Sequence, residues 1–187
     1  MPLFPSLPHD ALVKDIYPIN PDLFRPWCEV EEAIMRAPSS FSAGERELMG
    51  AFVSRLNSCT YCYSSHAEAA AILGVDRKIF EPLMEDIDTS PVDDKLKPIF
   101  HFLKKLTLTS YKLIQADADA VFAAGWDEKA LQDAILVCCC FSFMNRLVDG
   151  HGLPSDPKLF EDRGRRHAEQ GYVAQYATET GSVEQVE

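Results

Sequence analysis

Two cysteines and a histidine lie close together in the stretch NSCTYCYSSHAEAA, residues 57–70. Cys62 follows Cys59 by three residues, and His66 follows Cys62 by four. Residues three and four apart are neighbours on a helix, with Cβ atoms about 5–6 Å apart, so the three side chains would share one face. A helix N-terminus stabilises a thiolate, and a nearby histidine can take the thiol proton. The stretch therefore suits an activated thiol beside a second thiol, which could form a disulfide after oxidation.

Four interpretations of this stretch are open. A structural disulfide would close a loop of only a few residues and remove little entropy from the unfolded chain. Zinc needs four ligands, or three and a water, and no second cluster accompanies Cys59, Cys62 and His66. The pair could also be two inert core thiols. Redox chemistry is favoured because a histidine lies one turn from a helical CxxC, and we predict neither a metal ion nor another cofactor.

Cysteine usage favours a reducing compartment. The 187 residues are 47% apolar and 25% charged, which is typical of a globular protein, and we expect one domain over residues 1–187. Three of the six cysteines, Cys138, Cys139 and Cys140, are consecutive. That layout is poor for a disulfide framework, and a chain of this length can bury a core without cross-links. We therefore expect a cytoplasmic location, and either core packing or an oligomer interface for the three consecutive cysteines.

Charge and hydropathy argue against two classes of partner. The net charge of −11 repels phosphate backbones, so nucleic acid is not an expected partner. The N-terminal sequence has neither the basic nor the apolar region of a secretory signal. The longest apolar run, around residues 134–144, is about half of the roughly 20 residues that a membrane-spanning helix needs. We expect no membrane association.

The rest of the chain reads as helices. Prolines punctuate residues 1–26, which we expect to form an extended arm that packs on the domain. Apolar periodicity and capping residues then predict helices over residues 22–37, 42–56, 59–73, 76–85, 92–110, 117–124, 127–148 and 156–178. Asn57 and Ser58 are good N-cap types for the helix that carries the cysteines. Residues 180–187 read as a polar, frayed tail. No segment alternates as a strand does, so the predicted class is all-α.

A later helix resembles the first half of the chain in size and position. Residues 130–149 could correspond to residues 45–66, with Leu131 in the place of Leu48. Asn145 and Asp149 would then occupy the places of Cys62 and His66. We expect two related helical halves, with Asn145 and Asp149 in a polar network that supports the site or a subunit contact.

The stretch ERELMGAFVSRLNSCTYCYSSHAEAA resembles the AhpD-like alkylhydroperoxidases of the carboxymuconolactone decarboxylase superfamily, in particular the peroxidase-related branch. The family pattern is a glutamate, eleven residues, CxxC, three residues and a histidine. Glu47, Cys59, Cys62 and His66 fit this pattern in full. The motif covers about twenty residues, and the order of helices extends the resemblance over most of the chain.

The resemblance implies an all-α, AhpD-like fold in a homo-oligomer, a trimer or hexamer with a dimer as the alternative. It implies a haem-free peroxidase that reduces hydrogen peroxide or alkyl hydroperoxides. Cys62 would attack the peroxide and become a sulfenic acid, and Cys59 would resolve it as a disulfide. Glu47 and His66 would form the proton relay, and a dithiol or lipoyl-type reductant would restore the thiols.

Two features of this chain complicate a direct transfer of the family's residue roles. The helix dipole favours Cys59 as the thiol of lower pKa, whereas the position of His66 favours Cys62 as the attacking thiol, which is the order we predict. Well-known members also carry a relay histidine just before the second cysteine, where this chain has Tyr61. The alternatives are a thiol-disulfide redox sensor, a zinc-binding scaffold protein, or a decarboxylase-type enzyme whose chemistry needs no thiol pair.

Overall fold

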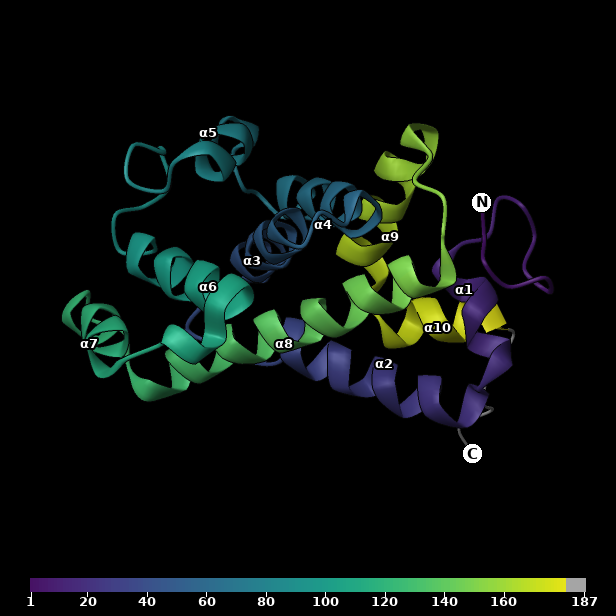
Figure 1. The fold of residues 1–187 in the computed structure, drawn as a ribbon, viewed down its shortest axis with the longest axis horizontal. Helices are drawn as coiled ribbons and strands as arrows, with labels where there is room; N and C mark the ends of the chain where they lie inside the picture. Colours follow the sequence, from purple (N-terminus) through teal and green to yellow (C-terminus); the bar gives the residue numbers. More distant parts are fainter. Residues whose placement is uncertain (181–187) are drawn as a thin grey trace.

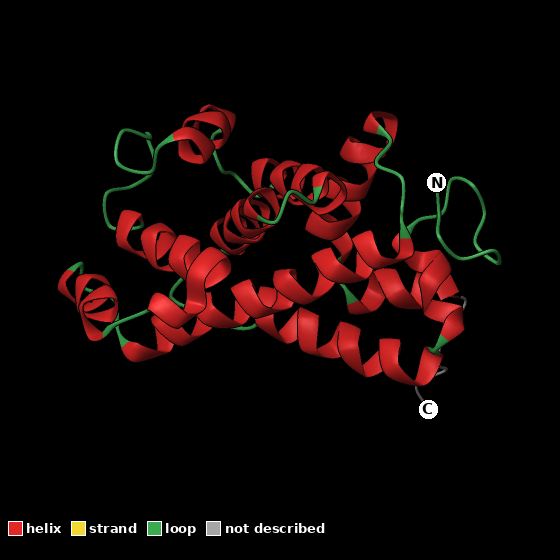
Figure 2. Ribbon diagram, viewed as in Figure 1, coloured by secondary structure: helices red, strands yellow, loops and turns green. Residues whose placement is uncertain are grey.

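The computed structural model describes residues 1–180, and these form an all-α structure, as predicted (Figures 1 and 2). No strand occurs within these residues. The helices are α1 (Val13–Ile16), α2 (Pro21–Arg36), α3 (Ala43–Leu56), α4 (Thr60–Ile72), α5 (Phe80–Glu85), α6 (Lys97–Thr109), α7 (Gln115–Ala123), α8 (Glu128–His151), α9 (Phe160–Gln170) and α10 (Val173–Thr180). Single 3-10 turns occur at Tyr17–Ile19, Arg77–Ile79, Ser110–Lys112 and Pro157–Leu159.

Helices α3 and α4 pack closely against each other, and α8 crosses them along the long axis of the molecule (Figure 1). Helix α2 lies beside α8, α6 and α7 cover the far end of α8, and α9 covers the outer side of α4. The N-terminal segment and α10 meet near the start of α2. The pair α3–α4 is therefore enclosed by elements from both ends of the chain.

Two hydrophobic clusters hold this arrangement together. The larger cluster is built around buried phenylalanines of α3, α6 and α8, including Phe52, Phe100 and Phe141. The smaller cluster contains Cys59 and Cys62 together with residues of the N-terminal segment, α2 and α10. The cysteine pair therefore lies in an apolar layer that the arm completes, which confirms that the arm packs on the domain.

Two glycines allow the close approaches that shape the site. A Cβ atom at Gly50 of α3 would overlap the ring of Phe141 of α8. A Cβ atom at Gly164 of α9 would overlap Glu68 and approach the carbonyl oxygen of Ser65, both on α4. Any larger side chain would force α8 or α9 away from the α3–α4 pair.

Most predicted helices are present, but several boundaries differ. The arm is not extended throughout, because residues 13–19 form α1 and a 3-10 turn, and α2 already begins at Pro21. Pro26 lies inside α2, where it lacks only one backbone donor. Helix α6 begins at Lys97 rather than near residue 92. The last predicted helix is divided at Gly171, whose φ of +70° suits glycine.

The start of α4 also corrects the sequence prediction. Cys59 itself is the N-cap, and Ser58 adopts a φ of +61°, a conformation uncommon outside glycine. In contrast, Ser42 caps α3 as predicted, in a capping box with Glu45. The polar tail predicted at 180–187 lies, apart from residue 180, outside the described residues. The relation between residues 45–66 and 130–149 stays a prediction.

Helix α8 is 24 residues long and apolar enough to span a membrane by length and composition. Half of its most apolar window is buried inside the protein. Its buried positions face α2, α3 and α6, which is the pattern of a core helix. Packing against these helices accounts for its buried apolar residues, whereas Leu136 and Phe143 of α8 are exposed.

Candidate functional site

The cysteine pair lies at the N-terminus of α4. After α3 ends at Leu56, a short turn through Ser58 redirects the chain, and Cys59 occupies the N-cap position. Cys62 follows in the first turn of α4, and both thiols are buried and reduced. The N-terminal backbone N–H groups of a helix favour a nearby negative charge. The turn thus places both sulfur atoms at the positive end of the α4 dipole.

The two thiols differ in their pKa. The hydrogen bond with Cys62 lowers the pKa of the Cys59 thiol. The same hydrogen bond, followed by burial, raises the pKa of the Cys62 thiol well above its ordinary value. Of the two thiols, Cys59 therefore loses its proton more readily and Cys62 holds its proton more firmly.

Asn145 of α8 forms hydrogen bonds with the end of α3 and the turn that precedes Cys59. Its side chain accepts a hydrogen bond from Asn57 at 2.9 Å and donates one to Ser54 at 3.0 Å. Hydrogen bonding from Asn145 also acts to lower the pKa of Cys62, against the larger effects that raise it. The polar network expected around this residue is present, and it ties α8 to the turn between α3 and α4.

His66 and Glu47 form a buried pair. Nδ1 of His66 lies 2.7 Å from Oε2 of Glu47, and the Glu47 side chain has no exposed surface. A carboxylate can only accept hydrogen bonds, so Nδ1 of His66 carries a proton. In a neutral imidazole, Nε2 is then the free acceptor. Glu47 therefore fixes His66 in the tautomer that can take a proton.

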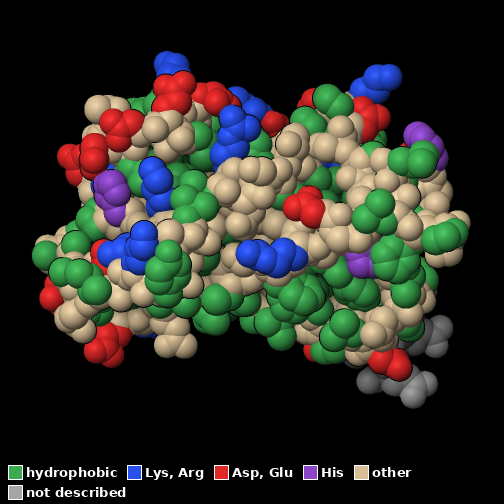
Figure 3. All heavy atoms as spheres, in the orientation of Figure 1, with side chains coloured by type: hydrophobic (Ala, Val, Ile, Leu, Met, Phe, Trp, Pro, Cys, Tyr) green, Lys and Arg blue, Asp and Glu red, His purple; other side chains and the backbone are tan. Residues whose placement is uncertain are grey.

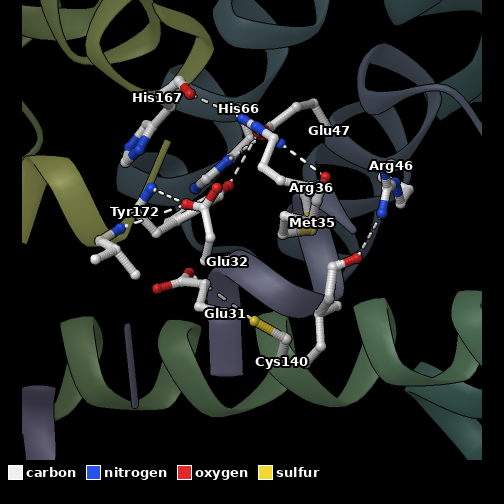
Figure 4. A network of polar contacts seen from close by, with 12 residues as sticks. Glu31, Glu32, Met35, Arg36, Arg46, Glu47, His66, Cys140, His167 and Tyr172 are labelled. Atoms are coloured by element: carbon white, nitrogen blue, oxygen red, sulfur yellow. Dashed lines mark hydrogen bonds and ion pairs between the residues drawn. The ribbon is translucent and has the colours of Figure 1, made fainter. Parts of the chain in front are cut away.

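Two further residues hold the Glu47 carboxylate (Figure 4). Arg36 of α2 donates to Oε1 at 2.5 Å, and the hydroxyl of Tyr172 donates to the same oxygen at 3.0 Å. Burial opposes ionisation of Glu47, but the hydrogen bond from His66 and the nearby positive charges outweigh it and lower its pKa to about 2. The Glu47 side chain is ionised at neutral pH.

His66 is held by rings on two sides. Its ring meets Phe141 edge-on at a centroid distance of 4.5 Å and stacks on His167 of α9 at 4.7 Å. Burial, followed by the charge of His66, lowers the pKa of His167 to about 3. The His167 ring is therefore neutral where it stacks on His66. The backbone carbonyl of His167 accepts a hydrogen bond from Arg36 at 2.8 Å.

A cavity of about 110 Å³ joins these groups. Cys62 and His66 both line it, together with His167 and Tyr172. A separate hollow of about 150 Å³ lies against Cys59, lined by Arg55, Ser58, Thr60 and Tyr63. The two cysteines therefore face two different spaces, with the histidine on the side of Cys62.

Tyr61, which stands where a relay histidine was expected, anchors the arm. Its hydroxyl accepts a hydrogen bond from the backbone N–H of Val13 at 3.1 Å. The guanidinium carbon of Arg163 lies 3.8 Å from the centre of its ring. Burial raises the pKa of Tyr61, so the phenol stays neutral. Tyr61 lines the cavity and joins the arm to α9.

Glu31 is a second buried carboxyl beside the cavity, and sequence reasoning missed it. Its described polar contact is Sγ of Cys140, 3.9 Å from Oε1. Burial, followed by the charge of Glu47, raises the pKa of Glu31 to about 8. Glu31 is therefore mostly protonated at neutral pH. A glutamate among EVEEAIMR carries no signal that distinguishes it from its neighbours.

The structure brings the four predicted site residues into one region, but they do not all line the same cavity. Glu47 contacts His66, His66 shares a cavity with Cys62, and Cys59 lies on the opposite side of Cys62. Among the side chains that the structure describes, no group of three or more His, Cys, Asp or Glu could hold a metal ion. Sequence reasoning also missed Arg36, Tyr172 and His167, which come from distant segments.

Comparison with known proteins supports the resemblance. Residues 21–84 match the carboxymuconolactone decarboxylase family. No curated protein matches the chain. Among solved structures, an uncharacterized peroxidase-related protein from Silicibacter sp. TM1040 is 24% identical, with a TM-score of 0.73 over 82% of this chain and 80% of that one.

A second solved structure shows the same fold. It is described as an alkylhydroperoxidase AhpD core, an uncharacterized peroxidase-related protein from Ralstonia eutropha JMP134. It is 21% identical, with a TM-score of 0.71 over 80% of this chain and 78% of that one. The AhpD-like fold predicted from the sequence is confirmed.

Proposed function

From the premise that its residues 21–84 match the carboxymuconolactone decarboxylase family and its fold is AhpD-like, we propose that this chain is a haem-free cysteine peroxidase. The substrate would be hydrogen peroxide or an alkyl hydroperoxide. The observation that carries the proposal is that Cys62, one cysteine of the CxxC pair, and His66 line the same cavity. His66 is oriented there by its hydrogen bond with Glu47.

The reaction needs one proton acceptor and one nucleophile in that cavity. His66 takes the proton of the Cys62 thiol through Nε2, while Glu47 stabilises the imidazolium that forms. The Cys62 thiolate attacks the terminal peroxide oxygen, the O–O bond breaks, and the alkoxide leaves as an alcohol with the proton from His66. Cys62 is then a sulfenic acid, and sulfur has been oxidised by two electrons.

Cys59 completes the cycle. Its thiolate attacks the Cys62 sulfur, the S–O bond of the sulfenic acid breaks as the disulfide forms, and the hydroxide that leaves takes up a proton from solvent as water. The lowered pKa of Cys59 suits this second step. A dithiol or lipoyl-type reductant would then restore both thiols, with the hollow beside Cys59 as its approach. Two thiols are consumed and regenerated for each peroxide.

The assembly and location are part of the same proposal. Large hydrophobic side chains of α2 and α8 are exposed, among them Leu23, Val30, Leu136 and Phe143. Figure 3 shows hydrophobic side chains gathered along the lower part of the molecule, where these helices run. A homo-oligomer, a trimer or hexamer, would cover such a surface. We propose that it acts in the cytoplasm, where thiols are kept reduced.

Peroxide consumption by the reduced protein with a dithiol reductant tests the proposal. We expect turnover by the wild type, none by Cys62→Ser, and wild-type rates for Cys139→Ser, which removes an exposed cysteine outside the site. A Cys62→Ser variant that still consumes peroxide at the wild-type rate would contradict the mechanism. A disulfide that forms without turnover would instead indicate the redox sensor.

The order of the cysteines has its own test. In Cys59→Ser, Cys62 has no resolving partner, so we expect a sulfenic acid that dimedone traps on Cys62. Mass spectrometry identifies the modified residue. Trapping on Cys59 in the Cys62→Ser variant, with none on Cys62 in Cys59→Ser, would reverse the order.

A further inference from the structure

Arg163 of α9 is a buried cation on the wall of the cavity. It is 6% exposed, and its guanidinium lies over the rings of Tyr61 and Phe160. Nη2 donates to the backbone carbonyl of Tyr61 at 3.3 Å. Nε and Nη1 are buried and have no hydrogen-bond partner among the described residues. Two donors of one charged group are thus left without an acceptor beside the cavity.

His167 adds a third such atom. Its Nδ1 is buried and has no hydrogen-bond partner within the described part of the chain. It lines the same cavity as Arg163. A buried donor or acceptor without a partner is destabilising, and more so when it is charged, so native proteins rarely contain several together. Their concentration on one cavity points to a polar group that binds there.

The charges of the wall decide the sign of that group. Lys14, Arg163 and Arg166 line the cavity, and Asp162 is the acidic residue that lies 2.7 Å from Arg166. Glu31 also lines the cavity but is mostly protonated at neutral pH. The wall is therefore positive, although the whole chain carries a net charge of −11. Such a wall attracts an anion.

The other walls and the volume limit what the anion can be. Apolar side chains of the arm, α8 and the segment before α9 complete the lining, including Val13, Met144 and Leu159. A water occupies roughly 10–15 Å³ by the same measure, so a ligand of about seven to eleven heavy atoms fits the cavity of about 110 Å³. One buried guanidinium suits a singly charged head better than a dianion.

We propose that this cavity is a substrate site for a short organic hydroperoxide that carries a carboxylate, and that Arg163 binds the carboxylate. The alkyl part contacts the apolar wall, and the hydroperoxide group reaches Cys62. The reaction rests on the proposed peroxidase function, but the binding of the carboxylate does not.

Calorimetric titration with hexanoate and with hexan-1-ol, at pH 7 and without peroxide, tests the site. We expect the wild type to bind hexanoate at least tenfold more tightly than hexan-1-ol, because only the carboxylate can accept from Arg163. Arg163→Gln should weaken hexanoate binding about tenfold or more and leave hexan-1-ol binding unchanged. Arg165→Gln is the matched control, since Arg165 lies on the same helix but pairs with Glu161 on the surface.

A second readout uses the wild type alone and so does not depend on the folding of a variant. Iodoacetamide is neutral and alkylates thiols, and mass spectrometry separates Cys62 from Cys59. Bound hexanoate should slow alkylation of Cys62 at least fivefold, whereas the same concentration of hexan-1-ol should not.

Equal binding of hexanoate and hexan-1-ol to the wild type would overturn the carboxylate site, and so would unchanged binding in a folded Arg163→Gln variant. Neither result depends on turnover. A protein that binds hexanoate but consumes no peroxide would keep this site and refute the peroxidase proposal. A protein that consumes peroxide but does not distinguish hexanoate from hexan-1-ol would keep the peroxidase proposal and refute the carboxylate site.

Discussion

Glu31 and Glu47 are both buried near the same histidine and cavity, yet they hold opposite charge states (Figure 4). The pKa of Glu47 is about 2, and the pKa of Glu31 is about 8. Burial raises the pKa of both carboxyls. Glu47 has three hydrogen-bond donors from His66, Arg36 and Tyr172, whereas the described contact of Glu31 is one thiol. Partners, not depth, decide which carboxyl is ionised.

The difference divides the work of the two residues. An ionised carboxylate can only accept, so Glu47 orients His66, and in the proposed mechanism it would stabilise the imidazolium. A protonated carboxyl adds no negative charge, so Glu31 leaves the cavity positive for an anionic ligand. In the two proposals, the same residue type therefore supports the base in one place and preserves the positive charge of the binding site in the other.

Removing the charge of Glu47 should have the largest effect. We expect Glu47→Gln to reduce peroxide consumption by about 10²-fold or more, because the imidazolium of His66 loses the negative charge that stabilises it. The free energy of unfolding should fall by about 3–5 kcal/mol, since Arg36 is left buried without its carboxylate. Steady-state kinetics and urea denaturation measure the two effects.

The control for Glu47→Gln is Glu85→Gln, which changes an exposed glutamate of α5. It should leave both quantities unchanged. If Glu47→Gln behaved like Glu85→Gln, the carboxylate would have no role in the base or in the stability of the site.

Glu31 should make the protein less stable as the pH rises. Its pKa is near 8 in the folded state against an ordinary value of 4.5, so the folded state binds more protons between these values. The free energy of unfolding should therefore fall by about 2 kcal/mol between pH 6 and pH 8 through this residue. Glu31→Gln keeps the neutral form and should lose this dependence, as measured by urea denaturation at each pH.

Glu29→Gln is the matched variant, because Glu29 lies on the same helix with more than half of its side chain exposed. It should keep the pH dependence of the wild type. A Glu31→Gln variant with the same loss between pH 6 and pH 8 would show that Glu31 is already ionised at pH 6, and the contrast with Glu47 would disappear.

The local sequence pattern was enough to predict Glu47 and the residues near it as site residues. Glu47, Cys59, Cys62 and His66 lie within twenty residues of one helical hairpin, where spacing alone determines which side chains are neighbours. Apolar periodicity likewise predicted the helical class and most helices. Boundaries at prolines and at the turn before Cys59 were less accurate, because tertiary packing permits a proline inside α2 and a positive φ at Ser58.

The remaining residues of the site depend on contacts between segments that are distant in the sequence. Arg36 reaches Glu47 from α2, Tyr172 reaches it from the segment before α10, and Arg163 meets the cavity from α9. Nothing in the spacing of these residues connects them. The protonation of Glu31 is also a property of burial rather than of sequence. Such residues become visible only when the helices are placed against one another.

The smallest expected effect comes from the third partner of Glu47. Tyr172→Phe removes the hydroxyl that donates to Oε1 at 3.0 Å, but Arg36 still donates to the same oxygen. We therefore expect a loss of about 1 kcal/mol in the free energy of unfolding and only a few-fold slower peroxide consumption. The exposed Tyr111 provides the control Tyr111→Phe, which should change neither. A loss as large as that of Glu47→Gln would mean that the ionised state depends on all donors acting together, whereas no loss would mean that His66 and Arg36 alone maintain it.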